Sequence, residues 1–265
     1  MGEVIVVTSG KGGVGKTTTT ANIGVGLAMQ GKKVCVIDAD IGLRNLDVVL
    51  GLENRIVYDI VDVVDKNCRI KQALIKDKRY DGLFLLPAAQ TKDKNSVTEK
   101  QMIELCNELK ESHDFVIVDC PAGIEQGFKN AIAGADRAIV VTTPEISAVR
   151  DADRIIGLLE AAELRNPTLI VNRIRIDMVK RGDMMDIDDI TDILAIDLLG
   201  IVPDDEEIVI STNKGEPAVI NQESMSGRAF LNITKRIMGE EIEFLDLDIQ
   251  DGFMKKLKKL FNIGK

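Results

Sequence analysis

A glycine-rich run with two lysines and four threonines, SGKGGVGKTTTT at positions 9–20, has the clearest potential for chemistry. It contains the spacing G-x-x-x-x-G-K-T as Gly10, Gly15, Lys16 and Thr17. Glycines allow successive backbone N–H groups to approach a phosphate, the lysine pairs with its outer oxygens, and the threonine hydroxyl binds Mg²⁺. The run therefore predicts a phosphate-binding loop, with a ligand-free glycine-rich turn as the alternative. The predicted nucleotide-binding residues are Gly10, Lys11, Gly12, Gly13, Val14, Gly15, Lys16, Thr17 and Thr18.

Acidic residues stand where two apolar runs end. Asp38 and Asp40 follow the run that ends in VID, and Asp119 closes FVIVD and opens DCPAG. Because the carboxyl ends of parallel strands share one edge of a sheet, these carboxylates are expected beside the phosphate loop. With Thr17 they are the predicted Mg²⁺ ligands, directly or through water, and Asp40 is also the candidate to orient the attacking water. Each acid alone would suit a helix N-cap equally well.

The elements around these residues must position them. Short Val/Ile/Leu-rich runs alternate with helical stretches, and near-continuous apolar runs indicate strands that are buried on both faces of a parallel sheet. The predicted strands are 4–7, 33–38, 83–87, 115–119, 138–143, 168–172 and 199–202, and the predicted helices are 16–30, 97–111, 146–162, 186–194 and 227–238. The expected fold is an α/β P-loop NTPase, with a mostly parallel twisted sheet flanked by helices on both faces and an amphipathic helix at the C-terminus.

Two further strand ends offer contacts for a nucleotide base. Asn172 ends the strand predicted at 168–172, and Pro203 and Asp204 follow the strand predicted at 199–202. Both positions fall at the same carboxyl edge, and Arg173 could stack near the base. Core or turn roles suit these residues equally well.

The composition narrows the class of protein. A chain of 265 residues with 45% hydrophobic residues can build a large core, whereas a net charge of −9 and an aromatic content of 3% oppose a nucleic-acid-binding surface. The four cysteines lack metal-binding spacing. The sequence has no signal-peptide pattern and no run of 18 apolar residues, so a cytoplasmic location is expected.

The C-terminal end departs from this composition. After a domain predicted at 1–239, the stretch EEIEFLDLDIQD at 240–251 carries six acids and predicts a solvated, mobile tether, with a short helix or strand as the alternative. In GFMKKLKKLFNIGK at 252–265, all the large apolar side chains except Ile263 share an arc of about 120° on a helical wheel. The pattern is typical of an amphipathic helix on an anionic membrane, although a core-packing or partner-binding helix would look similar. The predicted membrane residues are Phe253, Met254, Leu257, Leu260 and Phe261 on the apolar side and Lys255, Lys256, Lys258 and Lys259 on the basic side.

The phosphate loop with its second lysine resembles a known family. KGGVGKT at 11–17 matches the loop K-G-G-x-x-G-K-T of the deviant Walker A ATPases. In that family the early lysine contacts the nucleotide of the other subunit in an ATP-bridged dimer. The resemblance implies this role for Lys11, in place of a solvated loop lysine.

Further runs resemble the septum-site-determining branch of this ATPase family over essentially the whole chain. They are IGLRNLD, DCPAG, PEISAVRDADRIIG at 144–157 and NKGEP at 213–217. The resemblance implies that the first run belongs to switch I, in which Asp38, Asp40 and Asn45 align with functional positions, and that DCPAG is switch II. It also implies a helix that borders the dimer interface and receives partner proteins; without the family, this helix would be a charged, solvated face. The implied interface residues are Glu145, Ser147, Asp151 and Asp153.

The resemblance implies a molecular switch that hydrolyses ATP with Mg²⁺. It would dimerise with ATP, bind the cytoplasmic face of the cell membrane as a peripheral protein, and recruit the division inhibitor MinC. The topological-specificity factor MinE, or a substitute for it, would stimulate hydrolysis. A ParA-like DNA-partitioning ATPase, a phosphotransferase for a small acceptor and an iron–sulfur nucleotide protein are the alternatives. The acidic body opposes the first, and the lack of a pair of loop cysteines opposes the last.

Overall fold

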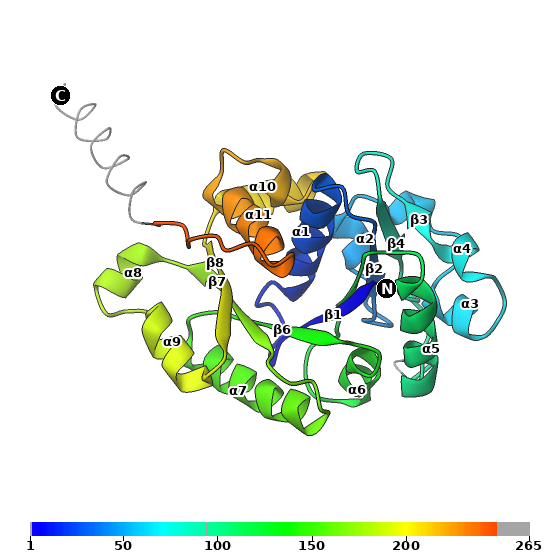
Figure 1. The fold of residues 1–265 in the computed structure, drawn as a ribbon, viewed down its shortest axis with the longest axis horizontal. Helices are drawn as coiled ribbons and strands as arrows, with labels where there is room; N and C mark the ends of the chain where they lie inside the picture. The colour runs from blue at the N-terminus through cyan, green and yellow to red at the C-terminus, as the bar shows by residue number, and fades with distance from the viewer. Residues whose placement is uncertain (1, 94, 248–265) are drawn as a thin grey trace.

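The computed structural model describes residues 2–93 and 95–247, and its centre is an eight-stranded sheet in the order β3-β4-β2-β5-β1-β6-β7-β8 (Figure 1). The strands are β1 (Glu3–Thr8), β2 (Val34–Asp38), β3 (Ile75–Lys76), β4 (Leu83–Leu86), β5 (Phe115–Asp119), β6 (Arg137–Thr142), β7 (Thr168–Ile174) and β8 (Asp197–Pro203). Only β3 is antiparallel to its neighbour. The mostly parallel sheet is therefore confirmed, and the short edge strand β3 is the one that was not predicted.

The centre of the sheet sets the position of the site. β1 pairs with β5 on one side and with β6 on the other, although β2 follows it in the chain. Val7 and Asp38 are both in register with Asp119. The carboxyl ends of β1, β2 and β5 thus lie side by side at a topological switch point, which is where open α/β sheets bind ligands.

Helices cover both faces of the sheet, as Figure 1 shows. One layer holds α1 (Lys16–Met29), α2 (Leu46–Val49), α10 (Glu206–Lys214), α11 (Met225–Ile237) and the two 3₁₀ turns Glu53–Arg55 and Ala218–Ile220. The helices elsewhere are α3 (Ile60–Val64), α4 (Ile70–Ala73), α5 (Glu99–Lys110), α6 (Gln126–Ile132), α7 (Ile146–Ala161), α8 (Ile176–Lys180) and α9 (Ile187–Leu194). Successive residues of β1 point to opposite faces of the sheet, so Val4 and Ile5 enter two separate apolar cores, one under each helix layer.

The five predicted helices correspond to α1, α5, α7, α9 and α11, with ends that differ by at most two residues. The helices α2, α3, α4, α6 and α8 and the two 3₁₀ turns were not predicted, because three to seven residues are too few to show a helical repeat of apolar residues. The nine-residue helix α10 was also not predicted. Of the helices described, none is long and apolar enough to cross a membrane.

Residues 240–247, the described part of the predicted tether, form neither helix nor strand. The Arg236 guanidinium donates hydrogen bonds to the carbonyl oxygens of Ile242 (2.9 and 3.0 Å), Glu243 (2.9 Å) and Leu199 (3.1 Å), and it lies 4.2 Å from the centre of the Phe244 ring. This part of the chain is thus anchored to α11 and β8. The predicted membrane segment, 252–265, lies outside the described residues.

Candidate nucleotide-binding site

The predicted phosphate loop joins β1 to α1 and has the backbone shape that a phosphate requires. Gly13 and Gly15 have φ values of 81° and 94°, a region that other residues enter only with strain. Gly15 is the N-cap of α1, so the positive end of that helix opens on the loop. At Gly10, a side chain would meet the Asp151 carbonyl oxygen at 2.2 Å, because the loop passes directly against α7.

Asn172 supports this loop from β7. Its side chain is 3% exposed, and its amide nitrogen donates a hydrogen bond of 2.8 Å to the Val14 carbonyl oxygen. Its amide oxygen accepts a hydrogen bond from the Arg173 N–H at 3.0 Å. A Cβ atom on Gly15 would lie 2.2 Å from the same amide nitrogen. Asn172 lies at the predicted strand end, and its side chain supports the phosphate loop from behind. The predicted contact with the base stays a prediction.

Lys16 and Asp119 form the charged centre of the site. The Lys16 ammonium lies 3.4 Å from an Asp119 carboxylate oxygen, and both side chains are at most 8% exposed. The same oxygen accepts a hydrogen bond from the Thr20 hydroxyl at 3.2 Å. Sequence reasoning missed Thr20, which lies four residues after Lys16 on the same face of α1. The lysine ammonium is thus aimed at the edge where the acids gather.

Asp38 organises the loop that follows β2, which is the predicted switch I. One carboxylate oxygen accepts a hydrogen bond from the Asp40 N–H at 3.0 Å, and the other accepts bonds from the N–H groups of Asn45 and Leu46, both at 3.1 Å. The Asp38 side chain is therefore committed to the loop and to the beginning of α2. Asn45, predicted as a catalytic residue, is exposed at the N-cap position of α2 and makes no side-chain cap.

Burial and neighbouring groups shift the pKa values of Asp38 and Lys16. Burial raises the pKa of Asp38, the Asp119 carboxylate raises it further, and backbone hydrogen bonds lower it only in part, so that it reaches about 7. Burial alone would lower the pKa of Lys16, but Asp119, Cys120 and Asp40 outweigh it and raise the pKa. Asp38 and Asp119 are neighbouring buried carboxylates, and a divalent cation would stabilise such a pair.

The donors present fit Mg²⁺ as it occurs beside nucleotides. Thr17 is half-buried in the first turn of α1, directly after Lys16. Within the described part of the chain, no group of three or more His, Cys, Asp or Glu could hold a metal ion by itself. This is compatible with Mg²⁺, which uses one or two carboxylates together with waters and phosphate oxygens.

The cysteines add no reactive thiolate to this site, although Cys120 directly follows Asp119. Cys35 lies in β2, Cys106 in α5 and Cys120 just after β5, all three buried, whereas Cys68 is half-exposed. Burial raises the pKa of the Cys106 and Cys120 thiols to about 12. The described cysteines therefore offer neither an exposed pair nor an activated thiolate.

Lys11 and the predicted interface residues lie at the outer lip of the loop. The Lys11 ammonium is exposed and donates a hydrogen bond to the Ser147 hydroxyl at 3.4 Å. Glu145 is the N-cap residue of α7 and accepts a hydrogen bond from the Thr143 hydroxyl. Asp153 is exposed about two turns further along α7, and Asp151 is half-buried against Gly10. Lys11 thus points away from its own phosphate loop.

The predicted base contacts lie where β7 and β8 end. Ile174 is in register with Pro203, and the Asp204 N–H donates to the Ile174 carbonyl oxygen at 3.0 Å. Arg173 is exposed and has a φ of 59°. An open cavity of about 880 Å³ is lined by Arg173 and Asp204 together with the interface residues Glu145 and Ser147.

Comparisons with known proteins agree with this geometry. A family model described as an AAA domain matches residues 2–171. The septum site-determining protein MinD of Bacillus subtilis is 59% identical, covering 99% of each chain. MinD from Pyrococcus horikoshii, solved with Mg-ADP, is 30% identical with a TM-score of 0.82, covering 89% of this chain and 96% of its own. The MinC:MinD complex of Aquifex aeolicus contains a chain that is 51% identical with a TM-score of 0.87, covering 92% of this chain and 99% of its own.

The nearest alternative family is more distant. A ParA family ATPase from Chlorobium tepidum is 22% identical with a TM-score of 0.75, covering 88% of this chain and 99% of its own, which shows a shared fold alone. The two MinD structures are much more similar, with TM-scores of 0.82 and 0.87. The chain therefore belongs to the MinD family of septum site-determining P-loop ATPases.

Proposed function

We propose that the chain is an ATP-hydrolysing switch for septum placement, which pairs with a second copy when it binds ATP and then holds to the inner surface of the cell membrane. The observation that carries the proposal is the buried Lys16–Asp119 pair beneath a glycine-rich loop at the switch point of the sheet. An ammonium and a carboxylate in this arrangement suit a triphosphate with Mg²⁺.

Each residue of the site has a role in that reaction. The backbone N–H groups of residues 10–17 and the Lys16 ammonium bind the phosphates. Thr17 and the edge carboxylates, chiefly Asp119, hold Mg²⁺, which neutralises charge on the phosphate oxygens. Asp40 orients the attacking water. Asp38 keeps switch I in place through its three backbone hydrogen bonds, so a change in its ionisation or its contacts alters the loop that carries Asp40 and Asn45.

The dimer completes the site through Lys11. Its exposed ammonium, which bonds to Ser147 on α7, supports a contact with the nucleotide of a facing copy. The cavity that joins Glu145 and Ser147 to Arg173 and Asp204 lies on the same border. A cation that is supplied across the interface makes hydrolysis depend on dimerisation.

The C-terminal segment makes membrane binding depend on the same event. Partial burial of its five apolar side chains contributes roughly 5–8 kcal/mol, and lysines near an anionic surface contribute about 1 kcal/mol each. Ordering the segment costs on the order of 10 kcal/mol, so one copy binds weakly. Two copies on one dimer raise the avidity by about 10²- to 10⁴-fold.

The partners follow from family membership. MinC is proposed to bind the dimer along α7, because MinC is the partner named in the Aquifex complex and α7 presents an exposed charged face. MinE or a functional substitute is proposed to stimulate hydrolysis on the membrane.

The first test uses Lys16→Ala with Lys100→Ala as its control, since Lys100 is an exposed lysine on α5. Cosedimentation with anionic vesicles is measured with and without ATP. We expect Lys16→Ala to lose the ATP-dependent fraction and Lys100→Ala to keep it. Hydrolysis per chain should rise with protein concentration and should be lost in Lys11→Ala. If Lys16→Ala pelleted normally with ATP, the proposal would be wrong.

The second test separates the tail from the site. Leu260→Glu places a charge within the apolar arc, whereas Ile263→Glu places the same charge outside it. We expect Leu260→Glu to bind ATP normally and to lose vesicle binding, while Ile263→Glu keeps most of both. Equal losses in the two variants would contradict the amphipathic helix. Stronger binding of the wild type to plasmid DNA than to vesicles would support the ParA-like alternative.

A further inference from the structure

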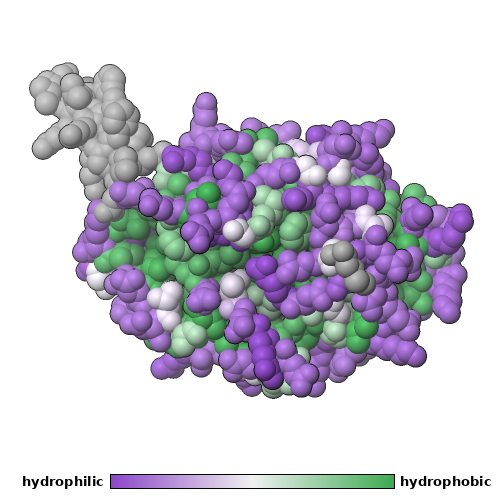
Figure 2. Space-filling view, viewed as in Figure 1, coloured by the Kyte–Doolittle hydropathy of each residue, from purple (hydrophilic) through white to green (hydrophobic). Residues whose placement is uncertain are grey.

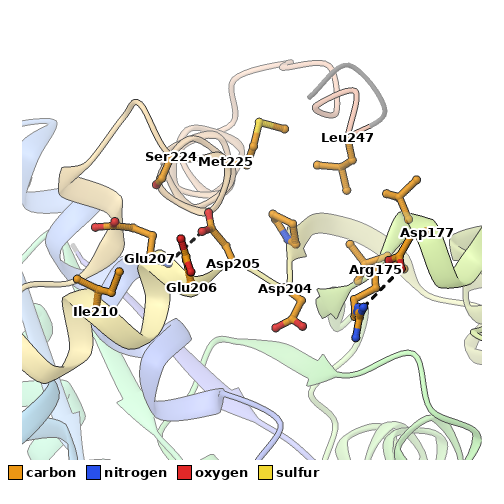
Figure 3. Close-up of a pocket in the computed structure, with 13 residues that line it drawn as sticks. Arg175, Asp177, Asp204, Asp205, Glu206, Glu207, Ile210, Ser224, Met225 and Leu247 are labelled. Atoms are coloured by element: carbon orange, nitrogen blue, oxygen red, sulfur yellow. Dashed lines mark hydrogen bonds and ion pairs between the residues drawn. The ribbon is translucent and has the colours of Figure 1, made fainter. Parts of the chain in front are cut away.

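A second open cavity, of about 880 Å³, lies beside the ends of β7 and β8 and is here called the acidic groove (Figure 3). Its carboxylates are Asp177, Asp204, Asp205, Glu206 and Glu207, and its one guanidinium is that of Arg175. Figure 3 shows Glu206, Glu207 and Ile210 at one end, Arg175 and Asp177 at the other, and Met225 and Leu247 along one rim. The groove thus combines a strong negative charge with apolar side chains.

Part of this charge is not neutralised locally. Asp177 pairs with Arg175 at 3.4 Å and Arg181 at 3.3 Å. Asp205 is used by the fold, because it accepts hydrogen bonds from the N–H groups of Glu207 and Ser226.

Among the described side chains, no cation forms an ion pair with Asp204, Glu206 or Glu207. Asp204 and Glu206 are exposed at the rim. A cationic occupant would therefore gain attraction without displacing an internal partner.

The apolar lining points to an amphipathic occupant. Ile210 is 41% exposed although it is a large aliphatic residue, and Met225 and Leu247 are each half-exposed at the rim. On the face in Figure 2, hydrophobic surface gathers in the band between α11 and the layer that contains α7 and α8. Lysines alone would leave this apolar surface in contact with water.

The described chain ends in the groove. Arg236 holds residues 242 and 243, so the segment that follows α11 doubles back along that helix, and Leu247 lines the groove beside Met225 at the start of α11. The 18 residues 248–265 continue from this point. Five residues separate Leu247 from Phe253, and an extended stretch of this length spans up to about 20 Å, so the basic segment can return to the groove.

We propose that the acidic groove binds the chain's own C-terminal segment, 252–265, when the chain is not on a membrane. The five lysines of the segment face the groove carboxylates, and its phenylalanines and leucines cover Ile210, Met225 and Leu247. The same two faces that suit an anionic bilayer suit this groove, so the two binding sites compete for one segment.

The groove also links this contact to the nucleotide. Pro203 and Asp204 line it and are also the residues predicted to contact the base. Binding of ATP at that edge competes with the segment and releases it, a step that rests on the proposed nucleotide site. ATP would then act twice, by pairing the copies and by freeing the tails.

The experiment measures proximity in the full chain, without a membrane. Cys68 is replaced by Ser, since it is the one described cysteine that is not buried, and Leu260→Cys is combined with either Ile210→Cys or Ile103→Cys. Ile210 and Ile103 are both 41% exposed, but Ile103 lies on α5, away from the groove. A short bismaleimide crosslinker is added to nucleotide-free protein, and the rate of intramolecular crosslinking is followed by mass spectrometry.

We expect the Ile210 variant to crosslink at least about tenfold faster than the Ile103 variant, because docking raises the effective concentration of the segment. Adding Glu206→Lys and Glu207→Lys to the Ile210 variant leaves the length of chain between the two cysteines unchanged. These changes should remove most of the difference in crosslinking rate between the Ile210 and Ile103 variants. The control changes Glu108→Lys on α5 and Glu111→Lys at its C-cap should not. Equal rates at Ile210 and Ile103, no effect of the groove charges, or crosslinks between two chains only would each overturn the proposal.

The nucleotide step has its own readout. ATP at a concentration that saturates the chain should slow crosslinking at Ile210 to the rate at Ile103. If ATP binds but crosslinking at Ile210 is unchanged, release by nucleotide is wrong. If ATP does not bind at all, the proposed site fails, and the comparison made without nucleotide still decides whether the segment docks.

Discussion

Asn172 offers the sharpest test of how the phosphate loop is held. Asn172→Ala removes an amide that is 3% exposed and leaves the carbonyl oxygen of the buried Val14 without its hydrogen bond of 2.8 Å. An unsatisfied buried acceptor costs about 1–3 kcal/mol. The Arg173 N–H also loses its partner, but Arg173 is exposed and water can replace that bond. We therefore expect the free energy of unfolding of the nucleotide-free chain to fall by about 1–3 kcal/mol.

The binding assay separates support of the loop from contact with the base. If Asn172 acts on the loop, Asn172→Ala weakens ATP, GTP and inorganic triphosphate by a common factor of up to about 150, since the loop binds the phosphates that all three share. Asn172→Asp keeps the size of the side chain but cannot donate to Val14, so it should behave similarly. Asn107→Ala, on the exposed face of α5, is the control. A loss for ATP with unchanged binding of triphosphate would refute the reasoning and restore the predicted base contact.

Two further predictions concern the switch and the C-terminal anchor. The pKa of Asp38 is raised from 3.8 to about 7, so the folded metal-free chain binds the proton more tightly than the unfolded chain does. The stability that this bound proton contributes is therefore lost as the pH rises from 3.8 to about 7. Thermal melts from pH 4.5 to 8 should show the wild type losing stability relative to Asp38→Asn, and a constant difference between the two would contradict the shift. Arg236→Lys keeps the charge but not the set of carbonyl bonds, so proteolytic cleavage within residues 240–247 should accelerate at least about tenfold. Arg228→Lys, on the exposed face of the same helix, should be cleaved at the wild-type rate, and equal cleavage of the two variants would mean that Arg236 does not anchor the segment.

The fold was predictable where the physical signal is periodic and local. β2 and β5 are apolar runs buried on both faces, and a strand of this kind leaves few alternatives to a parallel sheet. The same patterns fixed which side chains reach the carboxyl edge, so Asp38 and Asp119 were expected together and are in register. The phosphate loop was predictable because its glycines are required by backbone geometry, as the φ of 94° at Gly15 illustrates.

Side-chain direction beyond a strand end was not predictable. Asn172 at the end of a strand suits a base contact or a support for the loop, and only the packing against Gly15 shows that the amide turns under the loop. Thr20 was missed for a similar reason, since a run of four threonines does not show which hydroxyl faces Asp119. α10 was missed because Val209 and Ile210 are exposed, and exposed aliphatic residues break the pattern that identifies a surface helix.

The geometry also explains why the phosphate loop and α7 should respond together to a nucleotide. Gly10 has no room for a side chain because the Asp151 backbone is in contact with it, and Lys11, the next residue, bonds to Ser147 one turn earlier on the same helix. A movement of the loop toward a phosphate would therefore pull on the first two turns of α7, which carry the exposed residues Glu145 and Asp153. Close packing transmits such a displacement, because a dense interface cannot absorb it by compression. The start of α7, which is proposed to bind partners, is for this reason in direct contact with the loop that is proposed to bind phosphate.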